Sequence, residues 1–139
     1  MSLLAVAVVL AAQQAGPIPP RRAITETDLF RFVWIADPRI SPDGRDVAFV
    51  RVSVDKKKEG YETALWIVPA DGSAPPRAFT SGPHDTAPRW SPDGRRLAFL
   101  RADEKDGKPE PAQIHLIERG GGEARRVTDI PHGASAPVW

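Results

Sequence analysis

The apolar and turn-forming positions of this chain repeat after about fifty residues. Residues 38–51 read PRISPDGRDVAFVR, and residues 88–101 read PRWSPDGRRLAFLR. A later pair of segments, LWIVPADGSAPPRAFT and IHLIERGGGEARRVT, keeps nearly the same spacing, and so does the pair PHDTAPRW and PHGASAPVW. A constant period carried by several separate segments is typical of a repeat architecture.

Each repeat predicts four short antiparallel strands. A first strand leads into Ser-Pro-Asp-Gly, whose residues favour successive positions of a tight hairpin turn closed by a left-handed glycine. The second strand covers 46–52 or 96–101, and the third covers 64–68 or 113–117. Both are apolar almost without interruption, which is typical of strands covered on both faces. A glycine-containing turn then leads to a short fourth strand.

Four-stranded antiparallel units that bury both faces against neighbours are the blades of a β-propeller. The sequence therefore predicts an all-β fold, an incomplete β-propeller over residues 38–139. Its blades cover 38–87 and 88–136, and a third blade begins at 137. Because a propeller closes only with several blades, we expect this chain to be the N-terminal piece of a longer protein.

The residues before the first repeat predict a leader, a linker and a short helix. The apolar run from Leu3 to Ala12 is too short to span a bilayer but suits the centre of a secretory signal. We expect a signal peptide over 1–15, although no Lys or Arg precedes the run; an apolar strand or an unstructured leader is the alternative. Residues 16–37 then form a linker with a short helix inside 25–34. This predicts a secreted or periplasmic protein without a stable membrane span.

Composition excludes several functions. The 19 basic and 18 acidic residues leave a net charge of +1, so no basic face for nucleic acid is indicated. The chain has no cysteine, which excludes disulfides and thiolate chemistry. Its three histidines, His84, His115 and His132, do not have the spacing of a helical metal site. We expect no metal and no cofactor.

Individual candidates for chemistry have structural interpretations. GASAP around Ser135 lacks the last glycine of the nucleophile motif G-x-S-x-G, and the preceding repeat has DTAP in the same place. His84 and His132 recur in one Pro-His context, which indicates a loop role, and His115 lies inside an apolar strand. The Ser-Pro-Asp-Gly turn explains Asp43 and Asp93 as caps.

Large rings at strand positions are expected to fill space between blades; these are Trp66, Trp90 and Trp139. The mixed-charge runs at 55–62 and 103–111 indicate solvated hairpin loops. We therefore expect no catalytic, cofactor-binding or metal-binding residue in this chain.

The segment TETDLFRFVWIADPRISPDGRDVAFVR at 25–51 resembles the N-terminal region of prolyl oligopeptidase family serine peptidases, in their acylaminoacyl-peptidase and dipeptidyl-aminopeptidase branch. APRWSPDGRRLAFLR and EARRVTD are similar to the TolB-like propeller repeats of that family. The resemblance covers 25–139. It implies a propeller stacked over a C-terminal α/β-hydrolase domain that carries a Ser-Asp-His triad, and no triad position falls in this chain.

The resemblance leads us to expect the propeller segment of an exported serine-type peptidase that acts on short peptides. The propeller would act as a substrate filter and as a docking wall for the hydrolase domain, and this chain alone would catalyse nothing. The alternative is a non-enzymatic, TolB-like periplasmic propeller that binds proteins. A third possibility is a small protein that assembles a propeller from several copies.

Overall fold

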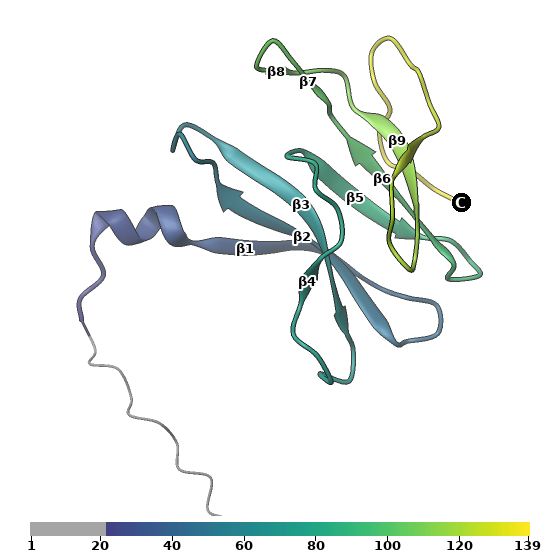
Figure 1. Ribbon diagram of the computed structural model, residues 1–139, viewed down its shortest axis with the longest axis horizontal. Helices are drawn as coiled ribbons and strands as arrows, with labels where there is room; N and C mark the ends of the chain where they lie inside the picture. The colour runs from purple at the N-terminus through teal and green to yellow at the C-terminus, as the bar shows by residue number, and fades with distance from the viewer. Residues whose placement is uncertain (1–21) are drawn as a thin grey trace, which may run out of the picture.

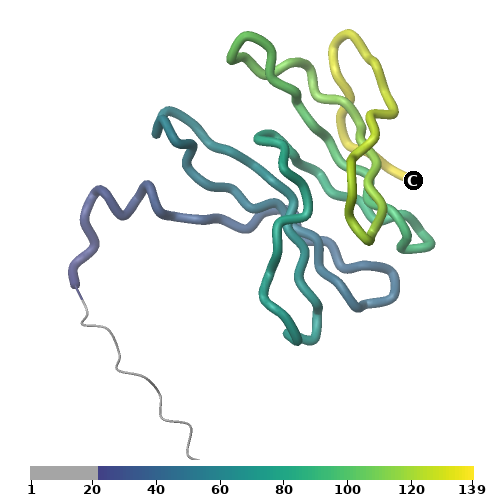
Figure 2. Tube along the Cα trace, viewed as in Figure 1, coloured from purple at the N-terminus to yellow at the C-terminus, as the bar shows by residue number. Residues whose placement is uncertain are grey.

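The computed structural model describes residues 22–139, and the expected signal peptide at 1–15 lies outside the described residues. The described part consists of two four-stranded antiparallel sheets and a two-stranded hairpin, with one short helix (Figure 1). The sheets follow one another along the chain and lie side by side (Figure 2). The all-β class and the partial propeller are therefore confirmed. No helix among residues 22–139 is long and apolar enough to cross a membrane.

The first sheet, which we call blade 1, pairs each strand with the next one in sequence. Its first strand begins at Val33, five residues before the predicted start of the blade at Pro38. It begins there because Val33 to Ile35 also pair with the long second strand. The predicted second and third strands lie inside longer ones. The strands are β1 (Val33–Ile40), β2 (Asp46–Val54), β3 (Tyr61–Pro69) and β4 (Arg77–Ala78).

The second sheet, blade 2, repeats this order with an extra hairpin between its second and third long strands. This hairpin forms within the charged run 103–111, which was expected to be a solvated hairpin loop. The strands of blade 2 are β5 (Asp85–Trp90), β6 (Arg96–Arg101), β9 (Gln113–Glu118) and β10 (Arg125–Arg126), and the hairpin is β7 (Glu104–Lys105) with β8 (Lys108–Pro109).

The first strand of each blade is bent at the same place by a β-bulge. The pairing shifts between Ala36 and Arg39 in β1, and the equivalent shift occurs in β5. The residue before proline has a left-handed φ in both strands, 45° at Asp37 and 53° at Ala87. Because proline has no N–H to donate, the bulge leaves it outside the ladder and turns the strand.

The main hydrophobic core lies between the two blades. One sheet is a single layer, so its apolar side chains become buried only when a second layer covers them. The buried cluster combines residues of both blades: Ala48, Val50, Leu65, Ile67 and Phe79 from blade 1, and Leu97, Phe99 and Ile117 from blade 2. The packing between blades is therefore what stabilises this part of the molecule.

The short helix expected within 25–34 is the 3₁₀ helix η1 (Glu26–Arg31). The Asp28 carboxylate accepts a hydrogen bond from the backbone N–H of Thr25 at 2.8 Å, which caps the helix. Arg22 Nη1 donates to the same carboxylate at 2.6 Å. The helix therefore starts at a local polar cap, while Leu29 and Phe30 stay exposed.

Candidate functional site between the two blades

The Ser-Pro-Asp-Gly turns are held by the same hydrogen bonds in both blades. In blade 1, Ser41 Oγ donates to Asp43 Oδ1 at 2.7 Å and accepts from the backbone N–H of Asp46 at 3.0 Å. In blade 2, Ser91 Oγ donates to Asp93 Oδ1 at 2.6 Å. The structure thus shows both aspartates in the turn role that the sequence suggested.

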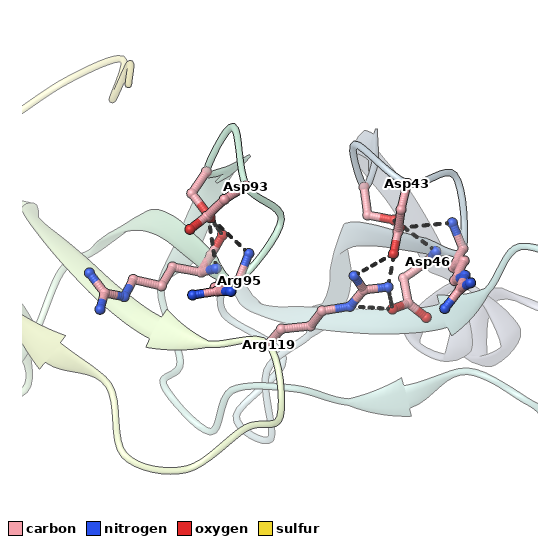
Figure 3. A network of polar contacts seen from close by, with 9 residues as sticks. Asp43, Asp46, Asp93, Arg95 and Arg119 are labelled. Atoms are coloured by element: carbon pink, nitrogen blue, oxygen red, sulfur yellow. Dashed lines mark hydrogen bonds and ion pairs between the residues drawn. The ribbon is translucent and has the colours of Figure 1, made fainter.

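Asp43 has a second role, because it belongs to an ion-pair network that joins the blades. Arg119, just after β9, points across the interface to two carboxylates of blade 1 (Figure 3). Its Nη1 lies 2.7 Å from Asp43 Oδ2, and its Nη2 lies 2.6 Å from Asp46 Oδ2. Hydrogen bonds from Arg119 and then Ser41 hold the pKa of Asp43 well below its usual range. Sequence reasoning missed Arg119, since a lone arginine after a strand carries no pattern.

Hydrogen bonds also join the first strand of each blade to the repeat that follows it, and these bonds recur from one repeat to the next. Trp90 Nε1 donates to the carbonyl oxygen of Arg39 at 3.0 Å, and Trp139 Nε1 donates to the carbonyl oxygen of Arg89 at 2.9 Å. Arg89 Nη1 also donates to Asp37 Oδ2 at 2.7 Å. Each of these bonds links a first strand to the following repeat, so Trp90 and Trp139 fix the register between repeats. Trp90 also packs against the core between the blades, whereas Trp139 is 52% exposed.

A buried ion pair lies where blade 2 begins. The Asp85 side chain is 0% exposed, and its two oxygens accept from Arg101 Nε at 2.7 Å and Nη2 at 2.9 Å. These hydrogen bonds raise the pKa of Arg101. A Cβ atom at Gly82 would lie 2.6 Å from Asp85 Oδ1, so glycine makes this close approach possible. The pair ties the start of β5 to the end of β6.

The histidine and serine candidates lie apart from this network. His84 Nε2 is 3.1 Å from Glu104 Oε1, and the His84 backbone forms an isolated β-bridge with Thr63 of blade 1. His115 is buried on β9, with its ring centroid 5.7 Å from that of Phe99. Ser135 and His132 are exposed in the segment that follows β10. Across residues 22–139, no three His, Asp or Glu side chains are arranged to hold a metal ion.

Sequence reasoning also missed an aromatic groove beside η1. The groove has a volume of about 370 Å³. The Trp34 and Tyr61 rings meet edge to face with centroids 5.5 Å apart, and Lys58 Nζ lies 4.7 Å from the Phe30 ring centroid. The groove forms because the start of β1 and the β2–β3 hairpin bring together aromatic residues from distant parts of the sequence.

The arrangement of strands and inter-blade contacts defines a partial β-propeller. No family model matches the chain. The chain is 41% identical over 121 residues to the uncharacterized peptidase YuxL of Bacillus subtilis (strain 168). The matched residues make up 86% of this chain and 18% of that protein. It therefore spans less than a fifth of this curated relative.

Solved structures give the same picture. An uncomplexed acylaminoacyl peptidase of Pyrococcus horikoshii matches 73% of this chain and 14% of its own, with 27% identity and a TM-score of 0.54. The β-propeller domain of the trilobed protease from Pyrococcus furiosus matches 70% of this chain and 28% of its own, with 26% identity and a TM-score of 0.53. The resemblance to the propeller segment of prolyl oligopeptidase family peptidases is confirmed.

Proposed function

We propose that this chain is the propeller part of an exported serine-type peptidase that acts on short peptides. The observation that carries the proposal is the 41% identity to a peptidase along most of the chain. The two-blade fold and its likeness to the propellers of solved peptidases support it. The catalytic serine, aspartate and histidine would belong to an α/β-hydrolase domain outside this sequence.

In that protein the propeller would control access and would not take part in the chemistry. The hydrolase serine would attack the scissile carbonyl while histidine accepts its proton, and the acyl group would then pass to water. A packed wall of blades over this site would admit short peptides and exclude folded chains. Interfaces such as the Arg119 network would keep neighbouring blades in register, so that the wall holds its shape.

The first experiment reads the coding sequence beyond the codon for Trp139. We expect further Ser-Pro-Asp-Gly repeats and then a G-x-S-x-G motif, with aspartate and histidine downstream. Repeats followed by a stop codon, without such a motif, would overturn the peptidase proposal in favour of a protein-binding propeller of the TolB-like type.

An activity assay on the complete reading frame then tests the filter. We expect cleavage of a dipeptide chromogenic substrate and at least tenfold slower cleavage of the same bond within a 30-residue peptide. The matched control replaces the motif serine with alanine and should be inactive on both. A fluorophosphonate probe should label the complete protein and leave the 139-residue chain unlabelled; stoichiometric labelling of the latter would contradict the assignment of catalysis to another domain.

We also propose export, because the apolar run from Leu3 to Ala12 has the length of a signal-peptide core. Fusing residues 1–21 to an alkaline phosphatase without its own signal tests this proposal. Periplasmic phosphatase activity is the expected result. A matched fusion with Val8→Asp and Val9→Asp should lose that activity, and equal activity from both fusions would contradict the proposal.

A further inference from the structure

The chain contains four Asp-Gly dipeptides, at 43–44, 71–72, 93–94 and 106–107. An aspartate before glycine is prone to isomerisation, because glycine has no Cβ to hinder the approach of its nitrogen to the side-chain carboxyl carbon. The four glycines also share one backbone conformation, with φ between 68° and 72°. Any difference in reactivity among the four dipeptides therefore comes from how their polar groups are held.

Three of the four aspartate carboxylates are fixed by the backbone that follows them. In Asp43, Asp71 and Asp93, Oδ1 accepts a hydrogen bond from the N–H two positions further on, at 3.2, 2.9 and 3.0 Å (Figure 3 shows the first and the last). This is the geometry of an Asx turn. It directs the carboxylate to the second N–H and keeps it from the nitrogen of the adjacent glycine.

The glycine nitrogens of the same three dipeptides are also engaged. The N–H groups of Gly44, Gly72 and Gly94 donate to the carbonyl oxygen three positions earlier, at 2.8, 3.1 and 2.8 Å. Such a nitrogen must give up its hydrogen bond before it can attack a carboxyl carbon. Both reacting groups are therefore restrained in these three turns.

The same turns disfavour the neutral acid from which water can leave. Hydrogen bonds lower the pKa of all three aspartates, so less of each carboxyl group is protonated at neutral pH. In each case a side-chain hydrogen bond is the largest cause; the pairs are Arg119 with Asp43, Ser73 with Asp71, and Ser91 with Asp93.

The dipeptide at 106–107 is the exposed turn of the β7–β8 hairpin, and it lacks these restraints. Within residues 22–139, neither the Asp106 carboxylate nor the Gly107 N–H has a hydrogen-bond partner. The residue two positions after Asp106 is Lys108, whose backbone pairs with Lys105 across the hairpin and forms no Asx turn. Asp106 also has a left-handed φ of 51°, unlike the aspartates of the other three turns. The difference is local to the hairpin.

We propose that Asp106 is the residue at which this protein isomerises to isoaspartate. The Gly107 nitrogen attacks Cγ of the neutral Asp106 side chain, and the new N–Cγ bond closes a succinimide ring. The Gly107 amide proton and the side-chain hydroxyl leave together as water. A second water then adds to the former backbone carbonyl carbon of Asp106, and the bond from that carbon to the Gly107 nitrogen breaks. One water is released and one is consumed, so no other reactant is needed.

The product has a longer backbone and a new anion. Because the chain now passes through Cβ and Cγ of residue 106, Lys105 and Lys108 no longer pair in register. The hairpin also carries Glu104, whose Oε1 is 3.1 Å from His84 Nε2. The α-carboxylate released at residue 106 is the group that a carboxyl methyltransferase specific for isoaspartate would methylate. The proposal does not depend on peptidase activity.

Incubation of the folded 139-residue chain at neutral pH, followed by peptide mapping, tests the proposal. Circular dichroism checks that the chain stays folded, and electron-transfer fragmentation locates isoaspartate at each of the four dipeptides. Methylation by an isoaspartate methyltransferase measures the same product independently. We expect isoaspartate to form at Asp106 about tenfold faster than at any other Asp-Gly dipeptide. In concentrated urea the four rates should converge, because the hydrogen bonds that separate them are lost.

Two variants assign the product to its residue. Asp106→Glu keeps the charge but would have to close a larger ring, so the main isoaspartate signal should disappear. Asp71→Glu is the matched control at another exposed Asp-Gly dipeptide, and it should leave the rate at Asp106 unchanged.

Three results would overturn the proposal. The first is an equal rate at all four dipeptides in the folded chain, and the second is a faster rate at one of the other three. The third is an excess at Asp106 that persists undiminished in urea, which would assign the effect to neighbouring residues in the sequence and not to the fold.

Discussion

Blade 1 and blade 2 share a strand order, a turn and a bulge. They differ in the side chains at two matching positions of the first strand. At matching positions on the first strand, blade 2 has Asp85 and Trp90, whereas blade 1 has Ile35 and Ile40. Asp85 and Trp90 are engaged in hydrogen bonds at a covered interface, whereas both isoleucines are exposed. The residues that both repeats share specify the blade. The two positions that differ separate a blade whose first strand is covered from one whose first strand is exposed.

The largest expected effect breaks the buried ion pair of blade 2. Asp85→Ala leaves the Arg101 guanidinium without its partner in a largely buried place, so the free energy of unfolding should fall by about 4 kcal/mol. Ile35→Ala at the matching position of blade 1 should cost less than about 1 kcal/mol, because that side chain is exposed. Urea unfolding of the two variants measures the difference, and equal losses would contradict the proposed contrast between blades.

The next effect concerns apolar packing on the same two faces. Leu97→Ala creates a cavity in the core between the blades and should lower the free energy of unfolding by about 3 kcal/mol. Val47→Ala at the matching position should cost about 1 kcal/mol or less, because Val47 is only partly buried. Thermal unfolding followed by circular dichroism compares the variants. A loss at Val47 as large as that at Leu97 would mean that the face of blade 1 turned away from blade 2 is also covered in solution.

Variants of the Ser-Pro-Asp-Gly turn should destabilise both blades equally. Ser41→Ala and Ser91→Ala each delete a hydroxyl that donates to an aspartate and accepts a backbone N–H within the turn. Each should lower the free energy of unfolding by about 1–2 kcal/mol. Chemical denaturation should give similar values for both, and a strongly unequal pair would show that the turns are not equivalent.

The smallest effect is the pH-dependent contribution of the Arg119 network. Because hydrogen bonds from Arg119 depress the pKa of Asp43, the ion pair stabilises the fold above the unfolded-state pKa of about 4. That stabilisation is lost as falling pH protonates the carboxylate. Arg119→Gln should therefore lower the Tm modestly at pH 7, and the difference from the unchanged chain should shrink below about pH 4.

Arg95→Gln is the matched control for the pH experiment. Asp93 accepts a hydrogen bond from the backbone N–H of Arg95, which does not require the arginine side chain. The Arg95 charge contributes less to the lowered pKa of Asp93 than the hydrogen bond from Ser91 does, so the Tm of Arg95→Gln should stay close to that of the unchanged chain at every pH. A Tm difference for Arg119→Gln that persists undiminished at pH 2–3 would show that Arg119 acts through packing.

Local features of the fold were predictable because they depend on neighbouring residues. Ser-Pro-Asp-Gly specifies its turn through bonds such as Ser41 to Asp43, two positions apart. The apolar runs predicted the long strands for the same reason. The early start of β1 was not predictable, since Val33 becomes a strand residue only by pairing with Ser53. The charged run 103–111 was expected to be a hairpin loop, but the pairing of β7 with β8 inside it was not predicted.

The sequence by itself determined the period, the turns, the antiparallel strands and hence the partial propeller, because each depends on short-range preferences repeated in order. Only the tertiary structure decided which face of a blade is buried and which arginine has a carboxylate. Arg119 meets Asp43 across 76 positions of sequence, while Arg51 and Arg101 look equivalent until the opposite strand shows Ile35 in one blade and Asp85 in the other. Such pairings depend on distance in space, which a repeat pattern does not encode.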